Sequence, residues 1–181
     1  MLGLRQLEER LNRISGLNVL HLRAGYFMEN TLGQADAIAQ MGFAVGPLRA
    51  DLKLPMIAAQ DIGEYAGEAL SRLDFAGHQV QELHGQRDLS YAEMTAILGK
   101  AIGKPDLKYS QITSEQFRAT LVRLGMSENV AGLLVELAEG LDSSHIRALE
   151  PRSARNTTPT SYEKFVSESF LPVYRGKQTA A

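Results

Sequence analysis

Apolar residues recur at helical spacing in several separate stretches of this chain. Residues 4–14 place leucine or isoleucine at every third or fourth position, and Gly16 then predicts the end of that helix. The same spacing predicts further helices over residues 30–41, 62–70, 94–102, 117–124, 130–141 and 160–166. Capping residues support the predicted helix starts: Asn30, Asp61, Ser90, Thr113, Ser127 and Thr160.

Short apolar runs lie between these helices and predict strands. The run from Leu17 to Leu22 is mostly apolar, which is typical of a strand buried on both faces. Shorter strands are expected at residues 43–45, 56–59, 80–83 and 107–112. Strands that alternate with more numerous helices predict an α/β fold, helix-rich and with a few short strands. We expect one domain over residues 1–172 and a flexible tail over residues 173–181.

Composition narrows the classes of function. Apolar residues make up 44% of the 181 residues and charged residues 22%, which is ordinary for a globular domain. A net charge of -2 argues against a nucleic-acid partner, and the absence of cysteine excludes disulfides and thiolate chemistry. The four histidines have no metal-ligand spacing, so we expect no metal site. No signal-like or membrane-spanning apolar stretch stands out, which favours a cytoplasmic protein without a membrane partner.

Familiar catalytic motifs are missing from the sequence. There is no G-x-G-x-x-G, the glycine pattern that lets backbone amides reach a dinucleotide diphosphate. No tyrosine has a lysine four residues later, so the acid–base pair of ordinary short-chain reductases is absent too. Ser161 and Lys164 have the spacing of an acyl-serine motif, but its companion motifs are missing, and a helix start explains them better.

One segment, residues 23–30, has the composition of a ligand site. It follows a predicted strand, and ligands of open α/β sheets bind just beyond the carboxyl ends of strands. Tyr26, Phe27 and Met28 can form an apolar wall, and Asn30 offers an amide. Alternatively, Phe27 and Met28 belong to the core and Asn30 only caps a helix, because core and pocket share this composition.

The order of several segments resembles that of the NmrA-like proteins, atypical short-chain dehydrogenases/reductases. Residues 22–30 (Leu-Arg-Ala-Gly-Tyr-Phe-Met-Glu-Asn) are similar to the family's Leu-Arg-Pro-Gly-Phe-Phe-Met-Glu-Asn, with Ala24 in place of proline. Asp61-Ile62-Gly63 resembles the family's Asp-Ile-Gly helix start. Residues 82–93 resemble its Leu-x-Gly and Leu-Ser-x-x-Glu segment, and residues 159–161 its closing Thr-Pro-Thr helix.

This resemblance implies a Rossmann-like fold and an NAD(P)H cofactor. It covers the C-terminal part of the family only, so the first five strands and the glycine-rich loop have no counterpart here. By residue-by-residue resemblance, Gly25, Tyr26 and Phe27 lie on the nicotinamide side of the site. Met28, Asn30 and Met56 lie near a small apolar substrate. Together these residues would form one wall of the site.

The resemblance also implies an incomplete sheet. The strand from Leu17 to Leu22 would have an unpaired edge, which predicts a homodimer, a partner chain over this strand, or aggregation. The favoured function is the substrate-side part of an NAD(P)H-dependent oxidoreductase or redox-sensing regulator, not catalytically competent alone. A cofactor-free module that binds a small ligand or a protein remains the alternative, and a hydrolase with an unrecognised acid–base pair is a weaker one.

Overall fold

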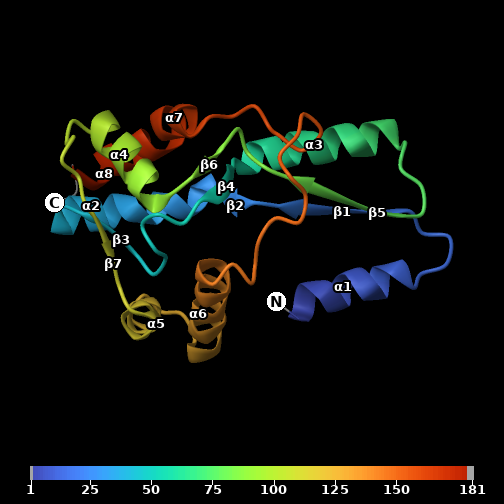
Figure 1. Ribbon diagram of the computed structural model, residues 1–181, viewed down its shortest axis with the longest axis horizontal. Helices are drawn as coiled ribbons and strands as arrows, with labels where there is room; N and C mark the ends of the chain where they lie inside the picture. Colours follow the sequence, from blue (N-terminus) through green and yellow to red (C-terminus); the bar gives the residue numbers. More distant parts are fainter. Residues whose placement is uncertain (1, 179–181) are drawn as a thin grey trace.

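The computed structural model describes residues 2–178, and its longest strands form a parallel pair. β1 (Val19–Ala24) pairs with β5 (His78–Leu83) over six residues. Helix α3 (Ala59–Arg72) lies on one side of the pair and α1 (Leu2–Asn12) on the other (Figure 1). β1 starts two residues later than predicted, and none of its residues is buried, so the expectation of burial on both faces was wrong.

Two smaller sheets continue from this pair. β2 (Tyr26–Phe27), β4 (Leu54–Ile57) and β6 (Asp88–Leu89) form one, with β4 in the centre. β3 (Ala44–Gly46) and β7 (Tyr109–Gln111) form the other as a parallel pair. The few short strands and many helices confirm the predicted helix-rich α/β class. The two-residue strands β2 and β6 were not predicted.

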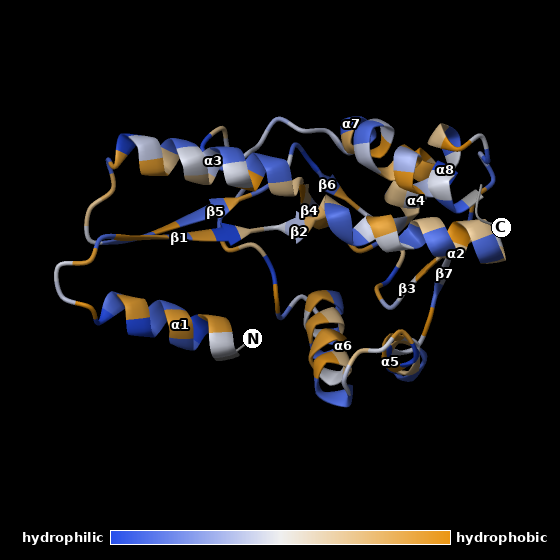
Figure 2. Cartoon of the chain, turned by 180° about the vertical axis from the view of Figure 1, so that it is seen from behind, coloured by the Kyte–Doolittle hydropathy of each residue, from blue (hydrophilic) through white to orange (hydrophobic). Residues whose placement is uncertain are grey.

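The main core lies at the end of the molecule away from β1 and β5. A 3-10 turn (Met28–Gly33) leads into α2 (Gln34–Met41), which packs against the last helix of the chain, while α4 (Tyr91–Ala101) packs on the segment just before that helix (Figure 2). Those C-terminal segments are α7 (Tyr162–Phe165), a π-helical turn (Val166–Phe170) and α8 (Leu171–Gln178). Their side chains close the core over Ile38, Met56, Met94 and Leu98, each at most 1% exposed.

Two more helices form a hairpin beside this core. α5 (Ser114–Arg123) and α6 (Glu128–Asp142) pack against each other on the side opposite α3 and α4. The predicted caps at Ser90 and Thr113 are confirmed, each as a full capping box, and the Ser127 hydroxyl caps α6 as expected. Polar side chains therefore satisfy the first amides of these helices, as the sequence pattern indicated.

Three other predicted caps were wrong. Asn30 lies inside the 3-10 turn, and Gly33 precedes α2 instead. α3 begins two residues before Asp61, and Ser161 rather than Thr160 caps α7. Asp61 and Thr160 are instead bonded to each other: the carboxylate accepts from the Thr160 amide at 3.1 Å and from its hydroxyl at 2.6 Å. The local cap was replaced by a contact between segments far apart in the sequence.

The expected flexible tail from residue 173 is helical as far as the structure describes it. α8 continues to Gln178, and Tyr174 is 3% exposed with its ring stacked on Phe170 at 6.1 Å. Residues 179–181 lie outside the described residues. Pro172 is tolerated because the π-helical turn before it already shifts the hydrogen bonds, with the Leu171 amide donating to the Val166 carbonyl.

Candidate functional site

The segment singled out in the sequence lies where β1 and β5 end. The Gly25 amide donates to the Leu83 carbonyl at 2.9 Å, which holds the turn at the carboxyl end of β5. The chain then enters β2, where Tyr26 pairs with Met56 and Phe27 with Ile57. The structure therefore brings together the predicted residues of both segments, 25–30 and 56, at the edge where open α/β sheets bind ligands.

Two glycines allow the backbones to meet at this edge. A Cβ on Gly25 would lie 2.2 Å from the Pro55 carbonyl oxygen, and one on Gly85 would lie 1.4 Å from that of Met56. Neither position has room for a side chain. The turn is thus packed directly on β4, and the space beside Gly25 is filled by protein.

Tyr26 is held by a group of tyrosines. Its hydroxyl lies 2.8 Å from that of Tyr91, and the two rings meet edge to face. Tyr91 stacks on Tyr109 with ring centroids 4.9 Å apart, and the Tyr109 hydroxyl donates to the Leu48 carbonyl. Burial raises the pKa of Tyr26, while hydrogen bonds with Tyr91 and Asn30 lower it in part. The Tyr26 ring is therefore fixed and its hydroxyl stays protonated at neutral pH.

The predicted site residues separate into exposed and buried ones. Phe27 is 41% exposed and Asn30 is exposed, so both present side chains to solvent. Met28 is 1% exposed and Met56 is fully buried, and both belong to the main core. The alternative that Met28 is a core residue is therefore correct. The same alternative for Phe27 is wrong, because its side chain is exposed. Met56 pairs with Tyr26 and not with Phe27, so the two methionines contribute to the core rather than to the exposed surface.

Carboxylates surround the N-terminus of α3. Glu29 Oε1 accepts a hydrogen bond from the Ala59 amide at 3.0 Å, and its other oxygen is buried with no hydrogen-bond partner. Asp61, in the first turn, is 4% exposed. A helix N-terminus can bind phosphate through its free amides. Here the Ala59 amide already donates to the Glu29 carboxylate, and Asp61 adds a second negative charge in the first turn. This end of α3 therefore does not fit a diphosphate.

A buried pair at the end of β5 was missed in the sequence. Glu82 and His84 are 6% and 4% exposed, and His84 Nε2 lies 3.3 Å from a Glu82 carboxylate oxygen. The same carboxylate accepts from the amides of Leu149 and Glu150 at about 3 Å. The pair anchors the long segment between α6 and α7 on the sheet. No local pattern could have revealed it, because the donors lie more than sixty residues away in the chain.

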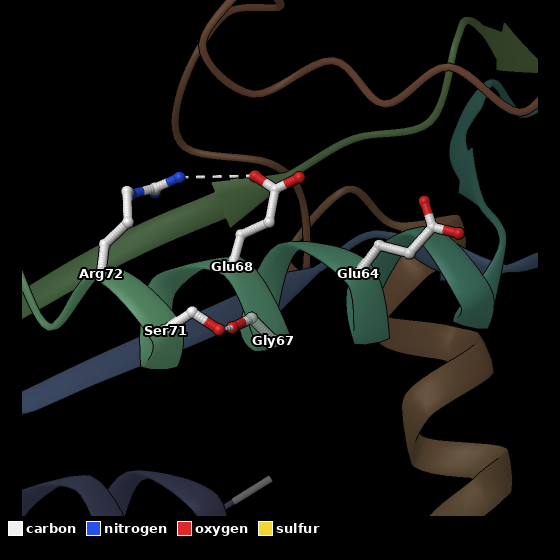
Figure 3. Close-up of a pocket in the computed structure, with 5 residues that line it drawn as sticks. All are labelled: Glu64, Gly67, Glu68, Ser71 and Arg72. Atoms are coloured by element: carbon white, nitrogen blue, oxygen red, sulfur yellow. Dashed lines mark hydrogen bonds and ion pairs between the residues drawn. The ribbon is translucent and has the colours of Figure 1, made fainter.

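Two hollows on the surface lie away from this turn. One, of about 470 Å³, runs along the outer side of α3 beside Gly67, where Arg72 is paired with Glu68 and the Ser71 hydroxyl donates to the Gly67 carbonyl (Figure 3). A second, of about 490 Å³, lies between α3 and β5. The charged groups of the first are satisfied by one another, as on a solvated helix surface. Within residues 2–178 no cluster of histidine and carboxylate side chains could hold a metal ion.

This arrangement of a short parallel sheet, an exposed aromatic turn at its carboxyl edge and a helix-rich core is that of a Rossmann-related domain. The chain belongs to the NmrA-like family, whose model matches residues 6–166. It is 36% identical over 125 residues to an NAD(P)H azoreductase of Xenophilus azovorans, covering 68% of this chain and 42% of that protein. It is 30% identical over 130 residues to quinone oxidoreductase 2 of Escherichia coli, covering 71% and 44%.

Solved structures agree on the fold. A crystal structure of the NADPH-dependent quinone oxidoreductase QOR2 from Escherichia coli superposes with a TM-score of 0.76 at 25% identity, covering 92% of this chain and 60% of that one. NmrA, a negative transcriptional regulator solved with NADP, gives a TM-score of 0.64 at 14% identity and shows the fold alone. The chain spans less than half the length of the curated relatives that it matches. No helix within residues 2–178 is long and apolar enough to cross a membrane.

Proposed function

We propose that this chain forms the substrate-side part of an NAD(P)H-dependent oxidoreductase or redox-sensing regulator of the NmrA-like family. Gly25, Tyr26 and Phe27 make the nicotinamide-side wall, and Asn30 contacts a small apolar substrate such as a quinone. Met28 and Met56 support this wall from below. The proposal is carried by one observation: Phe27 and Asn30 are exposed at the carboxyl edge of the sheet.

The residues present fit one end of the cofactor and not the other. A nicotinamide ring is flat and partly apolar, and it suits the face of an exposed phenyl ring such as that of Phe27. The sequence has no G-x-G-x-x-G, and the N-terminus of α3 is occupied by Glu29. The diphosphate and the adenosine would therefore be bound by residues outside this chain's described part. When bound, the cofactor would supply a hydride.

The support for oxidoreductase chemistry comes from the relatives. The azoreductase and the quinone oxidoreductase are named for the reduction of flat, conjugated acceptors with a nicotinamide cofactor. An exposed phenyl ring and an exposed amide within residues 27–30 match such acceptors, because an aromatic ring stacks on them and an amide donates to a carbonyl oxygen or azo nitrogen. We do not expect this chain alone to catalyse the reduction of such an acceptor.

The proposal can be tested with the two halves of the cofactor as separate ligands. We would record amide NMR spectra of the chain with reduced nicotinamide mononucleotide and, separately, with adenosine monophosphate. We expect the nicotinamide half to shift the resonances of residues 25–30, and the adenosine half to leave them unchanged. Phe27→Ala should abolish the shifts, and Leu124→Ala, at another exposed apolar residue, should not.

A folded chain whose residues 25–30 respond to neither half would contradict the proposal. That result would favour the alternative of a cofactor-free module. Shifts from the adenosine half alone would also contradict it, because the structure offers that half no phosphate site at this edge.

A further inference from the structure

Hydrogen bonds assign the hydroxyl protons of two tyrosines in the main core to acceptors of the chain itself. The Tyr109 hydroxyl donates to the Leu48 carbonyl at 2.7 Å. The Tyr162 hydroxyl donates to that of Thr31 at 2.9 Å, and the Thr31 hydroxyl in turn donates to the Met28 carbonyl. Two further tyrosines, at the start of β2 and at the start of α4, bond each other, and their protons remain to be assigned.

Burial decides which of these two hydroxyls, those of Tyr26 and Tyr91, is the donor. Tyr91 is 6% exposed, and the Tyr26 oxygen is the one acceptor that its hydroxyl reaches within residues 2–178. If Tyr26 donated instead, the proton of Tyr91 would be buried without an acceptor, which costs more than one hydrogen bond contributes. Tyr26 is only partly buried and does not meet this restriction. Tyr91 is therefore the donor, and the Tyr26 oxygen accepts.

Asn30 makes a second hydrogen bond to the same phenol oxygen. This bond lowers the pKa of Tyr26, as expected when an amide N–H donates to the oxygen and stabilises the phenolate. A tyrosine hydroxyl has two acceptor sites and one proton. Because Tyr91 and Asn30 fill the two acceptor sites, the proton of Tyr26 is directed at neither of them. Asn30 is exposed, so the Tyr26 hydroxyl lies where the buried tyrosines meet the surface of the candidate site.

We propose that Tyr26 donates this proton in a hydrogen bond to a carbonyl oxygen of a bound flat ligand, and that Tyr91 is the positioning residue that directs the proton there. The inference rests on the proposed function, because it takes residues 25–30 as the ligand-binding turn. Tyr91 acts only through Tyr26, since it is itself buried. The buried side of the tyrosine group thus sets the specificity of its exposed side.

Two donors at one position favour a carbonyl oxygen over an azo nitrogen. An amide nitrogen has two N–H groups, so Asn30 keeps one for the ligand after it has donated to Tyr26. A carbonyl oxygen has two lone pairs and can accept from both residues at once, whereas an azo nitrogen has one. The carbonyl of a quinone and the carboxamide of a nicotinamide both present such an oxygen on a flat ring, and binding experiments with each distinguish these two sources.

Pairs of ligands that differ in the carbonyl group test the proposal. Binding of 1,4-naphthoquinone is compared with that of naphthalene, and binding of nicotinamide with that of pyridine, by NMR titration. The chain has no cysteine with which the quinone could react. For at least one pair, Tyr26→Phe should weaken the carbonyl ligand by about threefold to tenfold, the range of one hydrogen bond, and leave its carbonyl-free partner unchanged.

The positioning role of Tyr91 is tested with the same ligands. Tyr91→Phe should weaken the carbonyl ligand by a smaller factor than Tyr26→Phe, because it removes only the hydroxyl that directs the Tyr26 proton and keeps the ring that stacks on Tyr109. Tyr65→Phe on α3 is the matched control and should change neither ligand. The infrared carbonyl stretch of bound naphthoquinone should lie at a lower frequency in the unmodified chain than in Tyr26→Phe, because a hydrogen bond weakens the C=O bond.

Hydroxyl protons of the unmodified, ligand-free chain give a readout that does not depend on the proposed function. In NMR spectra the Tyr91 hydroxyl proton should exchange slowly with water and lie close to the Tyr26 ring, and the Tyr26 hydroxyl proton should exchange fast. The reverse pattern overturns this inference and leaves the proposed function standing. So does equal weakening of both ligands of a pair by Tyr26→Phe, or no weakening of either carbonyl ligand. If no ligand shifts residues 25–30 of a folded chain, the proposed function fails and this inference fails with it.

Discussion

The Asp61 carboxylate holds both the backbone amide and the hydroxyl of Thr160, across 99 positions of sequence. Asp61 is 4% exposed, so these bonds compensate a charge that has lost most of its water. They join the start of α3 to the segment that leads into α7. The contact therefore fixes the C-terminal helices relative to the sheet.

Thr160→Val should destabilise the fold by about 1–3 kcal/mol, because it leaves a buried carboxylate oxygen without its hydroxyl donor. Thr120→Val is the control: its hydroxyl bonds the Gln116 carbonyl within an exposed helix, and its loss should cost less than about 0.5 kcal/mol. Denaturant unfolding measures both. Equal effects of the two substitutions would contradict the assigned role of Asp61.

Glu93 should make stability depend on acid pH. Its hydrogen bonds to Lys53 and to the Ser90 amide lower its pKa from 4.5 to about 2. Because the pKa of Glu93 is lower in the folded state, its carboxylate stabilises the fold above pH 4.5. This contribution to the free energy of unfolding is lost as the pH falls from about 4.5 through about 2. Because Glu93 is largely exposed, we expect less than about 1 kcal/mol. Glu93→Gln should reduce the loss of stability between neutral and acid pH, and Glu136→Gln on α6 should not. An unchanged acid profile in Glu93→Gln would falsify this assignment.

The glycine at the end of β5 should not tolerate alanine. A Cβ at Gly85 would lie 1.4 Å from the Met56 carbonyl oxygen, so Gly85→Ala must move one backbone and should cost more than about 3 kcal/mol. Gly132, inside α6, has nothing within 4 Å, and Gly132→Ala should stabilise by about 0.5–1 kcal/mol. Thermal unfolding of the two variants should therefore shift in opposite directions, and shifts of the same sign would refute the assignment.

Alkaline pH should unfold the chain through its buried tyrosines. Burial raises the pKa of Tyr91 well above 10, and it also raises the pKa values of Tyr109 and Tyr162. Because these tyrosines have a higher pKa in the folded state than in the unfolded state, they favour folding while they are protonated. This contribution to stability is lost as the pH rises beyond about 10.

Tyrosinate absorbance followed during alkaline titration should therefore rise in one step with unfolding. Tyr91→Phe should move that step to higher pH relative to Tyr65→Phe, provided the variants are compared at equal neutral-pH stability. Gradual ionisation of all six tyrosines in a folded chain would speak against their burial.

Patterns within one element were predictive, and contacts between elements were not. The caps at Ser90 and Thr113 were predicted correctly because every residue that forms them lies within one helical turn. Asp61 was misassigned because the same pattern is present there, but Thr160 competes for its oxygens. Strands β2 and β6 escaped prediction because two residues carry no periodicity.

The position of residues 25–30 in the fold was predictable from the sequence, and the burial of their side chains was not. Position after a strand located residues 25–30 correctly at the carboxyl edge of the sheet. Residue type alone could not tell that Phe27 is exposed while Met28 is buried, because this follows from the entry into the 3-10 turn. The burial of Glu82 and His84 depends on the amides of Leu149 and Glu150, which no local reading reveals.

The order in which this chain leaves the ribosome matters for the core described above. Met28 and Met94 share the core with Phe165, Val166 and Phe170, which follow Met94 by at least 71 residues and are synthesised that much later. The Tyr162 hydroxyl reaches Thr31 across 131 positions. At roughly 5–20 residues per second, the nascent chain spends several seconds with this apolar surface uncovered. A core that closes across such long sequence separations leaves apolar surface exposed to chaperones and to aggregation until α7 and the π-helical turn have been synthesised.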